Sequence, residues 1–180
     1  MKNKIEKELF SRDFKLQFLG YGDWLDEPDQ IQFEYKGFLC LIDRIIIKEP
    51  YALVEAYFGG HLCGYIFLPS DHPLYGKNFD EIDLDCWRGI THAEESTHGW
   101  KIGFDCAHSS DIVPSMLKLR TDGILQHIYD TQKEFIESPL FSPTYKNVSF
   151  CIKQCKSLAT QAYRMIPRMF QPKSVNPIQQ

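Results

Sequence analysis

The sequence predicts an α+β fold, in which a mainly antiparallel sheet is covered on one face by an amphipathic C-terminal helix. Apolar residues recur with period two before "KG" at 36–37, and a largely apolar strand follows it, which is the pattern of a β-hairpin over 31–49. In 148–166, by contrast, apolar residues recur at steps of three and four, as in a helix with one buried face. Together the two periodicities favour a sheet with a helix lying across it.

Further strands are expected wherever the alternation of apolar and polar residues resumes. Glycines at 59 and 60 should separate two of them, because glycine readily adopts a positive φ. In the last of these strands Cys106 is in phase with apolar Trp100 and Phe104, whereas Asp105 belongs to the opposite face. The predicted strands are 51–58, 62–69, 82–87 and 100–106.

The helical segments are predicted from composition and spacing. Residues 2–10 favour a short polar helix, and an irregular segment from 111 is expected to lead into a helix over 123–136. The final helix should begin at Ser142 and Pro143, which suit the N-cap and the first helical position. It should end near 167, where a proline follows the last periodic residue.

Length and composition indicate one domain. With 180 residues, 43% of them hydrophobic, the chain can bury a single core without a disulfide or metal staple. We expect a domain over 1–166, with 1–22 at its periphery, and a flexible tail over 167–180. No apolar run approaches the roughly 20 residues needed to span a bilayer. Because the start of the chain lacks a secretory pattern, we expect a cytoplasmic protein with free thiols, and Cys151 and Cys155 packed inside.

Charge is distributed unevenly along the chain. The net charge is −4, yet six Lys and Arg follow residue 137 and no Asp or Glu does, so removing these six charges leaves −10 on 1–137. An acidic body argues against a broad nucleic-acid-binding surface, whose affinity depends on neutralising phosphates. It is instead compatible with a small polar ligand or with a protein partner.

Polar residues of catalytic type gather at the ends of two predicted strands, in "RGITHAEE" (88–95) and "FDCAHSSD" (104–111). If the two strands are neighbours, these loops form one site, since strand ends present functional loops. Asp105, His108, Asp111 and His92 are the catalytic candidates. Thr91, Trp100, Arg88, Glu94 and Cys106 are the ligand-binding candidates.

Four interpretations of this cluster stay open. A divalent metal could be held by His92, Asp105, His108 and Asp111, although no two-ligand helix motif accompanies them and we do not favour it. Cys106 could be a nucleophile, but its phase places it in the core. His108 could form a metal-free acid–base pair with Asp105 or Asp111. Alternatively, the two carboxylates cap the loop backbone and His108 is structural, just as His72 is expected to build a turn before Pro73.

Four segments and a closing helix resemble a family of small uncharacterised proteins of bacteriophages and prophages. The segments are "W...EPD...F...G..C" (24–40), "HLCGYIFLPSDHPLYGK" (61–77), "RGITHAEE" and "WKIGFDCAHSSDIVP" (100–114), and the helix is "YKNVSFCIKQCKSLATQ". The family signature is CGYV...HP.YG, then HGGLTY, then W.(F/I)GFDC.H..D..P. The resemblance covers 24–162 and implies an accessory protein acting on host metabolism or host defence. This chain departs from HGGLTY, since Trp87 and Arg88 stand at the HG positions and His92 at the aromatic one. The departure weakens the metal interpretation further.

Two functions are therefore predicted. The first is a small-ligand site for a nucleotide-like or other polar metabolite, with or without hydrolysis, at the loops after 82–87 and 100–106. The alternative is a non-enzymatic acidic protein that binds and modulates a host macromolecule, for host takeover or counter-defence. In that case the binding surface would be built on Asp80, Glu81, Asp83 and Asp85.

Overall fold

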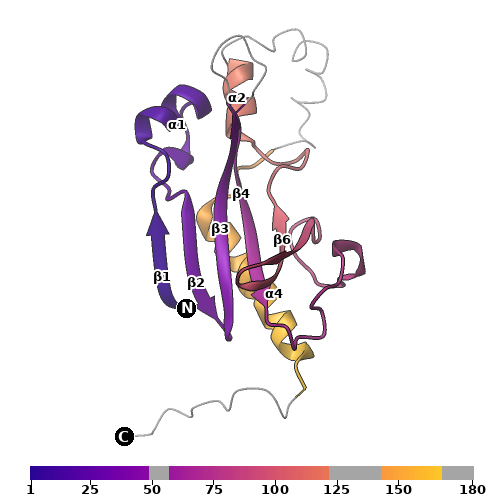
Figure 1. Cartoon of the computed structure of the whole chain (residues 1–180). Helices are drawn as coiled ribbons and strands as arrows, with labels where there is room; N and C mark the ends of the chain where they lie inside the picture. The colour runs from indigo at the N-terminus through magenta and orange to yellow at the C-terminus, as the bar shows by residue number, and fades with distance from the viewer. Residues whose placement is uncertain (49–56, 122–142, 168–180) are drawn as a thin grey trace, which may run out of the picture.

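The computed structural model describes residues 1–48, 57–121 and 143–167. Within them, six strands form one antiparallel sheet in the order β1-β2-β3-β4-β6-β5 (Figure 1). The strands are β1 (Lys2–Lys7), β2 (Gln30–Tyr35), β3 (Phe38–Lys48), β4 (Tyr57–Leu68), β5 (His92–Ser96) and β6 (Gly99–Asp105). The helices are α1 (Arg12–Leu19), α2 (Pro114–Thr121) and α4 (Val148–Met165), with short 3-10 turns η1 (Asp23–Leu25) and η2 (Phe79–Glu81). The predicted α+β class is confirmed.

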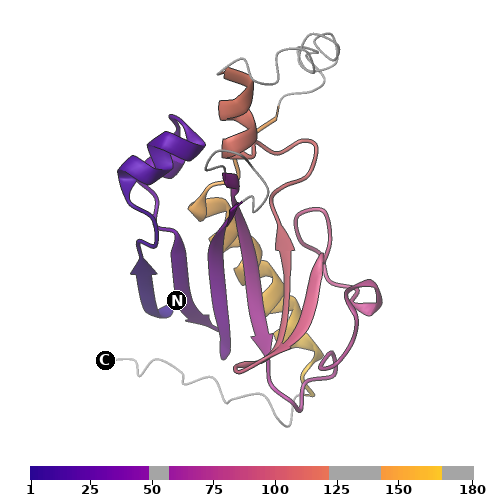
Figure 2. The same cartoon turned by 45° about the horizontal axis from the view of Figure 1, so that its top comes forward.

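Helix α4 lies across one face of the sheet, and α1 and α2 lie at one end of it (Figures 1 and 2). The core is the layer between α4 and the strands, where Phe33, Ile66 and Leu158 are fully buried. Burying a side chain of this size contributes about 1.5–3 kcal/mol. A Cβ on Gly64 would lie 2.4 Å from the Phe104 ring of the neighbouring strand and 2.9 Å from Cys155 Sγ of α4, so glycine at this position lets the helix approach the sheet closely.

The β-hairpin is confirmed, with Phe33 opposite Cys40 and Tyr35 opposite Phe38. The strand predicted over 100–106 is confirmed as β6. The prediction of two strands separated by glycines is wrong for the described part, because residues 57–68 form the single strand β4, which runs through both glycines. Residues 51–56 of that prediction lie outside the described residues.

The predicted helix over 2–10 is wrong. Residues 2–7 form edge strand β1, in which Lys4 and Glu6 form an ion pair on one face, as residues two apart do in a strand. The helix starts later, at α1, where the Ser11 hydroxyl accepts a hydrogen bond from the Phe14 N–H at 3.1 Å. Helix α2 likewise occupies a segment expected to be irregular, and the helix predicted over 123–136 lies outside the described residues.

The prediction of a strand over 82–87 is also wrong, although the predicted alternation of buried and exposed side chains is confirmed. Ile82 and Leu84 point into the core, but the segment crosses α4 rather than pairing with another strand. Gln161 of α4 accepts from the Asp85 N–H at 2.9 Å and donates to the Asp85 carbonyl at 2.8 Å. Side-chain amides of the helix thus satisfy the backbone groups that a neighbouring strand would otherwise satisfy.

The final helix begins five residues later than predicted. Thr144 pairs in parallel with Asp111, and this extended pairing keeps 143–147 out of the helix. Asn147 is the N-cap, and its side chain accepts from the Phe150 N–H at 2.9 Å. Cys151 and Cys155 are buried free thiols, as predicted. Of the expected tail, residues 168–180 lie outside the described residues. No helix in the described ranges is both long and apolar enough to cross a bilayer.

Candidate functional site

The loop that follows β6 is closed by two aspartates. Asp105 Oδ1 accepts a hydrogen bond from the Ala107 N–H at 2.9 Å, and Asp111 Oδ2 accepts one from the His108 N–H at 3.1 Å. The Asp111 N–H donates to the His108 carbonyl at 2.8 Å. Short side chains that bind nearby backbone groups in this way build tight, rigid loops. Both carboxylates therefore cap the loop, as the structural interpretation expected.

His108 and Asp111 also contact each other through their side chains. Nδ1 of His108 lies 3.3 Å from Asp111 Oδ2 and 3.7 Å from Asp105 Oδ1. The Asp111 side chain is fully buried and that of His108 is 25% exposed. A carboxylate at Nδ1 favours the tautomer with the proton on that nitrogen, which leaves Nε2 as an acceptor. Nε2 makes no hydrogen bond with another described residue.

A third donor, the indole of Trp87, binds the carboxylate of Asp111. Trp87 Nε1 donates to Oδ2 at 3.0 Å, so that one oxygen receives three donors. The other oxygen, Oδ1, is buried and accepts no hydrogen bond from a described residue, while the Lys146 ammonium lies 3.7 Å away. Asp111 is therefore fixed in position while one of its two oxygens keeps unused capacity to accept a hydrogen bond.

The two predicted loops meet through Trp87 and Arg88, of which Arg88 was a predicted site residue and Trp87 was not. Besides the Trp87 contact, Arg88 donates to Ser110 Oγ at 3.0 Å and lies over the Trp87 ring. The turn there holds Arg88 at a φ of 60° and Gly89 at 90°, and only the glycine adopts such a value without strain.

The other candidates lie on β5 and β6, except Thr91, which directly precedes β5. His92 pairs with Gly103, its Nε2 is 3.0 Å from Glu94 Oε1, and its ring packs against Tyr65. The pKa of Glu94 is lowered by hydrogen bonds from Lys101, 2.8 Å away, and from His92. Trp100 donates to the Lys77 carbonyl, and the Thr91 N–H to the Gly103 carbonyl. No contact among the described residues joins these four side chains to the loop at 105–111.

Cys106 lies in the core, as its phase predicted. The residue is 2% exposed, and its sulfur lies 3.9 Å from the Cys151 sulfur. The contact with Cys151 and burial both raise the pKa of Cys106 well above its usual value. A nucleophilic cysteine needs the opposite shift, toward the thiolate. The nucleophile interpretation therefore loses its support.

The four metal ligands considered for the cluster are not brought together, since His92 is on β5 beside Glu94. In 1–48, 57–121 and 143–167, no group of three or more His, Cys, Asp or Glu side chains could hold a metal ion. The acid–base pair of His108 and Asp111 is the interpretation with direct geometric support.

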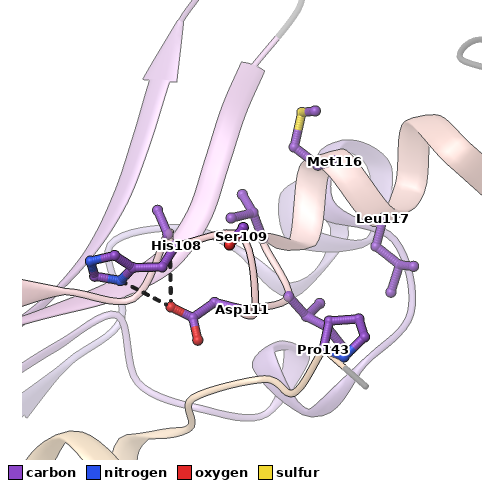
Figure 3. A pocket seen from close by; sticks show the side chains of 9 residues that line it. His108, Ser109, Asp111, Met116, Leu117 and Pro143 are labelled. Atoms are coloured by element: carbon purple, nitrogen blue, oxygen red, sulfur yellow. Dashed lines mark hydrogen bonds and ion pairs between the residues drawn. The ribbon is translucent and has the colours of Figure 1, made fainter. Parts of the chain in front are cut away.

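A pocket of 280 Å³ opens beside the loop. In Figure 3 the His108 ring and the Asp111 carboxylate are turned toward each other and away from Met116, Leu117 and Pro143, which form the apolar side of the pocket. The volume is near the lower end of the roughly 300–1,000 Å³ typical of ligand sites. The lining residues are Ala107, His108, Ser109, Asp111, Ile112, Val113, Met116, Leu117 and Pro143.

A buried ionic cluster that the sequence analysis missed joins β3 to the segments before β2 and before α4. The guanidinium of Arg44 donates to Asp29 at 2.9 Å and to the Tyr145 hydroxyl at 2.9 Å. Tyr145 donates to Glu27 at 2.6 Å, and the other oxygen of Glu27 accepts from the Val148 N–H at the start of α4. The signal was present in the hairpin, because Arg44 and Asp29 are in phase with its buried residues.

No protein-family model, curated protein or solved structure matches this chain. The function is therefore inferred from the geometry of the loop after β6 and of the pocket beside it.

Proposed function

We propose that this chain binds a small polar molecule at the pocket beside the 105–111 loop, with His108 as its acid–base group. The observation that carries this proposal is the His108–Asp111 pair at the wall of a 280 Å³ pocket. Asp111 fixes the orientation and tautomer of the imidazole, and a base held in this way can act on a bound molecule. The site needs neither a metal nor a thiolate.

The chemistry available to the pair is proton transfer. Nε2 of His108 would take a proton from a hydroxyl group or water, and the imidazolium that forms would be stabilised by buried Asp111 at Nδ1. Asp105, 3.7 Å from Nδ1, supports the same charge. A hydrolytic step on the bound molecule is consistent with these roles.

The size and lining of the pocket restrict the ligand. A volume of 280 Å³ suits one ring with polar substituents better than a dinucleotide. The apolar side formed by Met116, Leu117 and Pro143 favours a flat, partly apolar ring. A nucleoside-like metabolite combines these properties. An accessory role in the cytoplasm of a phage-infected host is part of the proposal and rests on the sequence resemblance alone.

Binding can be tested by calorimetric titration of the purified protein against a panel of nucleosides, bases and sugars. At least one compound should bind wild-type protein, and His108→Gln should bind it at least about tenfold more weakly. The control is His98→Gln, the same substitution in the turn between β5 and β6, which should leave the affinity unchanged. Equal affinity in folded His108→Gln and wild type would refute the assignment.

The alternative function stays a prediction with its own test. Asp80, Glu81, Asp83 and Asp85 are all exposed and form no ion pair with a described residue. Reversing these four charges should abolish capture of a basic protein partner from host lysate if the alternative holds, whereas His108→Gln should not affect it. The small-ligand proposal expects the reverse pattern for ligand binding.

A further inference from the structure

Strand β1 is an edge strand whose outer side is open. Within the described residues it pairs only with β2, and all six of its residues are exposed (Figure 1). The Lys7 carbonyl accepts a hydrogen bond from the N–H of Asp29, directly before β2, at 3.0 Å, so it points toward that strand. Because the backbone groups of successive residues in a strand point to opposite edges, those of Lys4 and Glu6 point outward. They can therefore pair with a strand of another chain.

Apolar side chains at this edge of the sheet are exposed to solvent. Ile5, in the middle of β1, is 50% exposed, and Met1 and Leu9 on either side of the strand are 51% and 53% exposed. In the other edge strand, β5, which the structure describes in full, no large apolar side chain is exposed. Exposed apolar side chains on an edge strand favour its pairing with another chain.

The charges in the centre of β1 are complementary to those of a second, antiparallel β1. When Ile5 lies opposite Ile5 of a second copy, Lys4 lies opposite Glu6 and Glu6 lies opposite Lys4. Lys4 and Glu6 form an ion pair on one face of β1, so two copies bring four alternating charges together on that face. Opposite charges at directly opposed positions stabilise an antiparallel pair. Lysines on an edge strand usually hinder pairing, but in this register each Lys4 faces a glutamate.

Strand β5 does not offer the same complementarity. Its charged residues Glu94 and Glu95 are adjacent, so two antiparallel copies of β5 place glutamates opposite or beside glutamates, which is destabilising. Glu94 is also paired already with Lys101, 2.8 Å away. A pair formed by β1 and β5 would join lysines to glutamates, but it would leave Ile5 without a large apolar partner. The self-pairing of β1 is therefore the arrangement that satisfies both its charges and its apolar residue.

We infer that two copies of this chain form a symmetric dimer through antiparallel pairing of their β1 strands, with Ile5 at the two-fold axis. Since β1 is the first strand of the sheet, the two sheets join into one continuous sheet. Strands that are antiparallel within one sheet are related by an axis perpendicular to it, so both α4 helices lie on the same face. The contact uses the same surface on both copies and closes on itself, hence association should stop at the dimer. It involves no residue of the proposed ligand site.

Charge reversal tests this contact by sedimentation velocity over a series of protein concentrations. Wild-type protein should pass from monomer to dimer and form nothing larger. Lys4→Glu and Glu6→Lys each place like charges opposite one another, and each should raise the dimer dissociation constant at least about tenfold. The double variant Lys4→Glu/Glu6→Lys exchanges the two charges and should dimerise like wild type. The control is Asp83→Lys, a reversal at another exposed acid, which should leave dimerisation unchanged.

Three results would overturn the dimer contact. The first is wild-type protein that remains monomeric at its highest soluble concentration. The second is association that Lys4→Glu weakens and Glu6→Lys strengthens, because this pattern identifies an acidic partner strand such as β5 or a strand of a different protein. The third is a double variant that has the circular dichroism spectrum of wild type and remains monomeric.

Ile5→Cys tests the register directly. Ile5 would face its copy as a pair without direct backbone hydrogen bonds, in which the two Cα atoms are about 4.5 Å apart, within the range that a disulfide bridges. Oxidised glutathione should therefore convert the two thiols of an Ile5→Cys dimer into a disulfide, while it is itself reduced to two thiols. Ile47→Cys is the control, because Ile47 is also exposed, at 63%, but lies on β3. Equal cross-linking of the two variants, or none at Ile5→Cys in a solution of dimers, would overturn the assigned register.

Discussion

Two buried polar clusters of this protein differ in how completely they are satisfied. In the ionic cluster, the Asp29 carboxylate accepts from the Leu9 and Phe10 N–H groups at 2.9 Å each, and it contacts the Arg44 and Lys15 cations. All four of the guanidinium contacts of Arg44 are hydrogen bonds of 3.3 Å or less. Around the loop at 105–111, by contrast, His61 Nδ1 and Asp111 Oδ1 are buried without a hydrogen-bond partner among the described residues.

The difference separates architecture from function. A satisfied network fixes one arrangement of the chain, and here it joins α1, β3, β4 and the start of α4. A cluster with unused capacity costs stability and persists where something else completes it. We therefore expect substitutions in the first cluster to affect folding, and substitutions in the second to affect ligand binding.

The largest effect is expected for Asp29→Asn. The substitution keeps the shape of a fully buried side chain but leaves the Arg44 and Lys15 cations with less compensating charge. Breaking a buried ion pair from one side costs about 3–5 kcal/mol of unfolding free energy, which urea denaturation measures.

Asp26→Asn is the matched control for this effect, because Asp26 is 79% exposed and pairs with Arg12 on the surface. Its cost should be below about 1 kcal/mol. Equal costs at the two positions would show that the buried cluster does not hold the fold together.

A smaller effect is expected for Trp87→Phe, which removes one of the three donors to Asp111 Oδ2 and keeps an aromatic ring against Phe150. A hydrogen bond to a charged group is worth about 1.5–3 kcal/mol, and urea denaturation should show a loss in that range. The control is Trp100→Phe, which removes an exposed hydrogen bond to the Lys77 carbonyl and should cost less. A larger loss at Trp100 would contradict the role given to Trp87 in fixing Asp111.

Local periodicity allowed the sheet and the last helix to be predicted, because each depends on which face of a segment is buried. It also predicted that Ile82 and Leu84 alternate inward, but it could not show that Gln161, 76 residues away from Asp85, replaces a neighbouring strand. Strand β1 has no buried face, since all six of its residues are exposed. It forms through its pairing with β2, which periodicity within 2–7 could not indicate.

The sequence predicted only those parts of the site that depend on residues close together in the chain. Asp105, His108 and Asp111 lie within one loop, so their proximity follows from the sequence. His92 was assigned to the loop because β5 was expected ten residues earlier, over 82–87. Arg44 and Tyr145 are 101 residues apart, and their contact depends on the packing of the whole domain. His61 was not among the predicted site residues, because its position near Asp105 depends on the pairing of β4 with β6.

The smallest effect concerns pH, and it compares two histidines. Burial lowers the pKa of both His61 and His72 from about 6.5. A base with a lowered pKa in the folded state contributes stability that is complete above the unfolded pKa and is lost as the pH falls below it. At His72 the reason is visible, because protonation of Nδ1 would replace the acceptor of the Leu74 N–H by a donor.

The unfolding free energy should therefore decrease as the pH falls from 7.5 to 5.5, by up to about 1.4 kcal/mol for each unit by which a pKa is lowered. Urea denaturation across this range measures the slope. In His61→Gln the slope should be smaller than in wild type but not zero, because His72 still contributes. A slope that is unchanged in His61→Gln would mean that the environment of His61 imposes no cost on its charged form. His61 could then not be counted as an unsatisfied member of the second cluster.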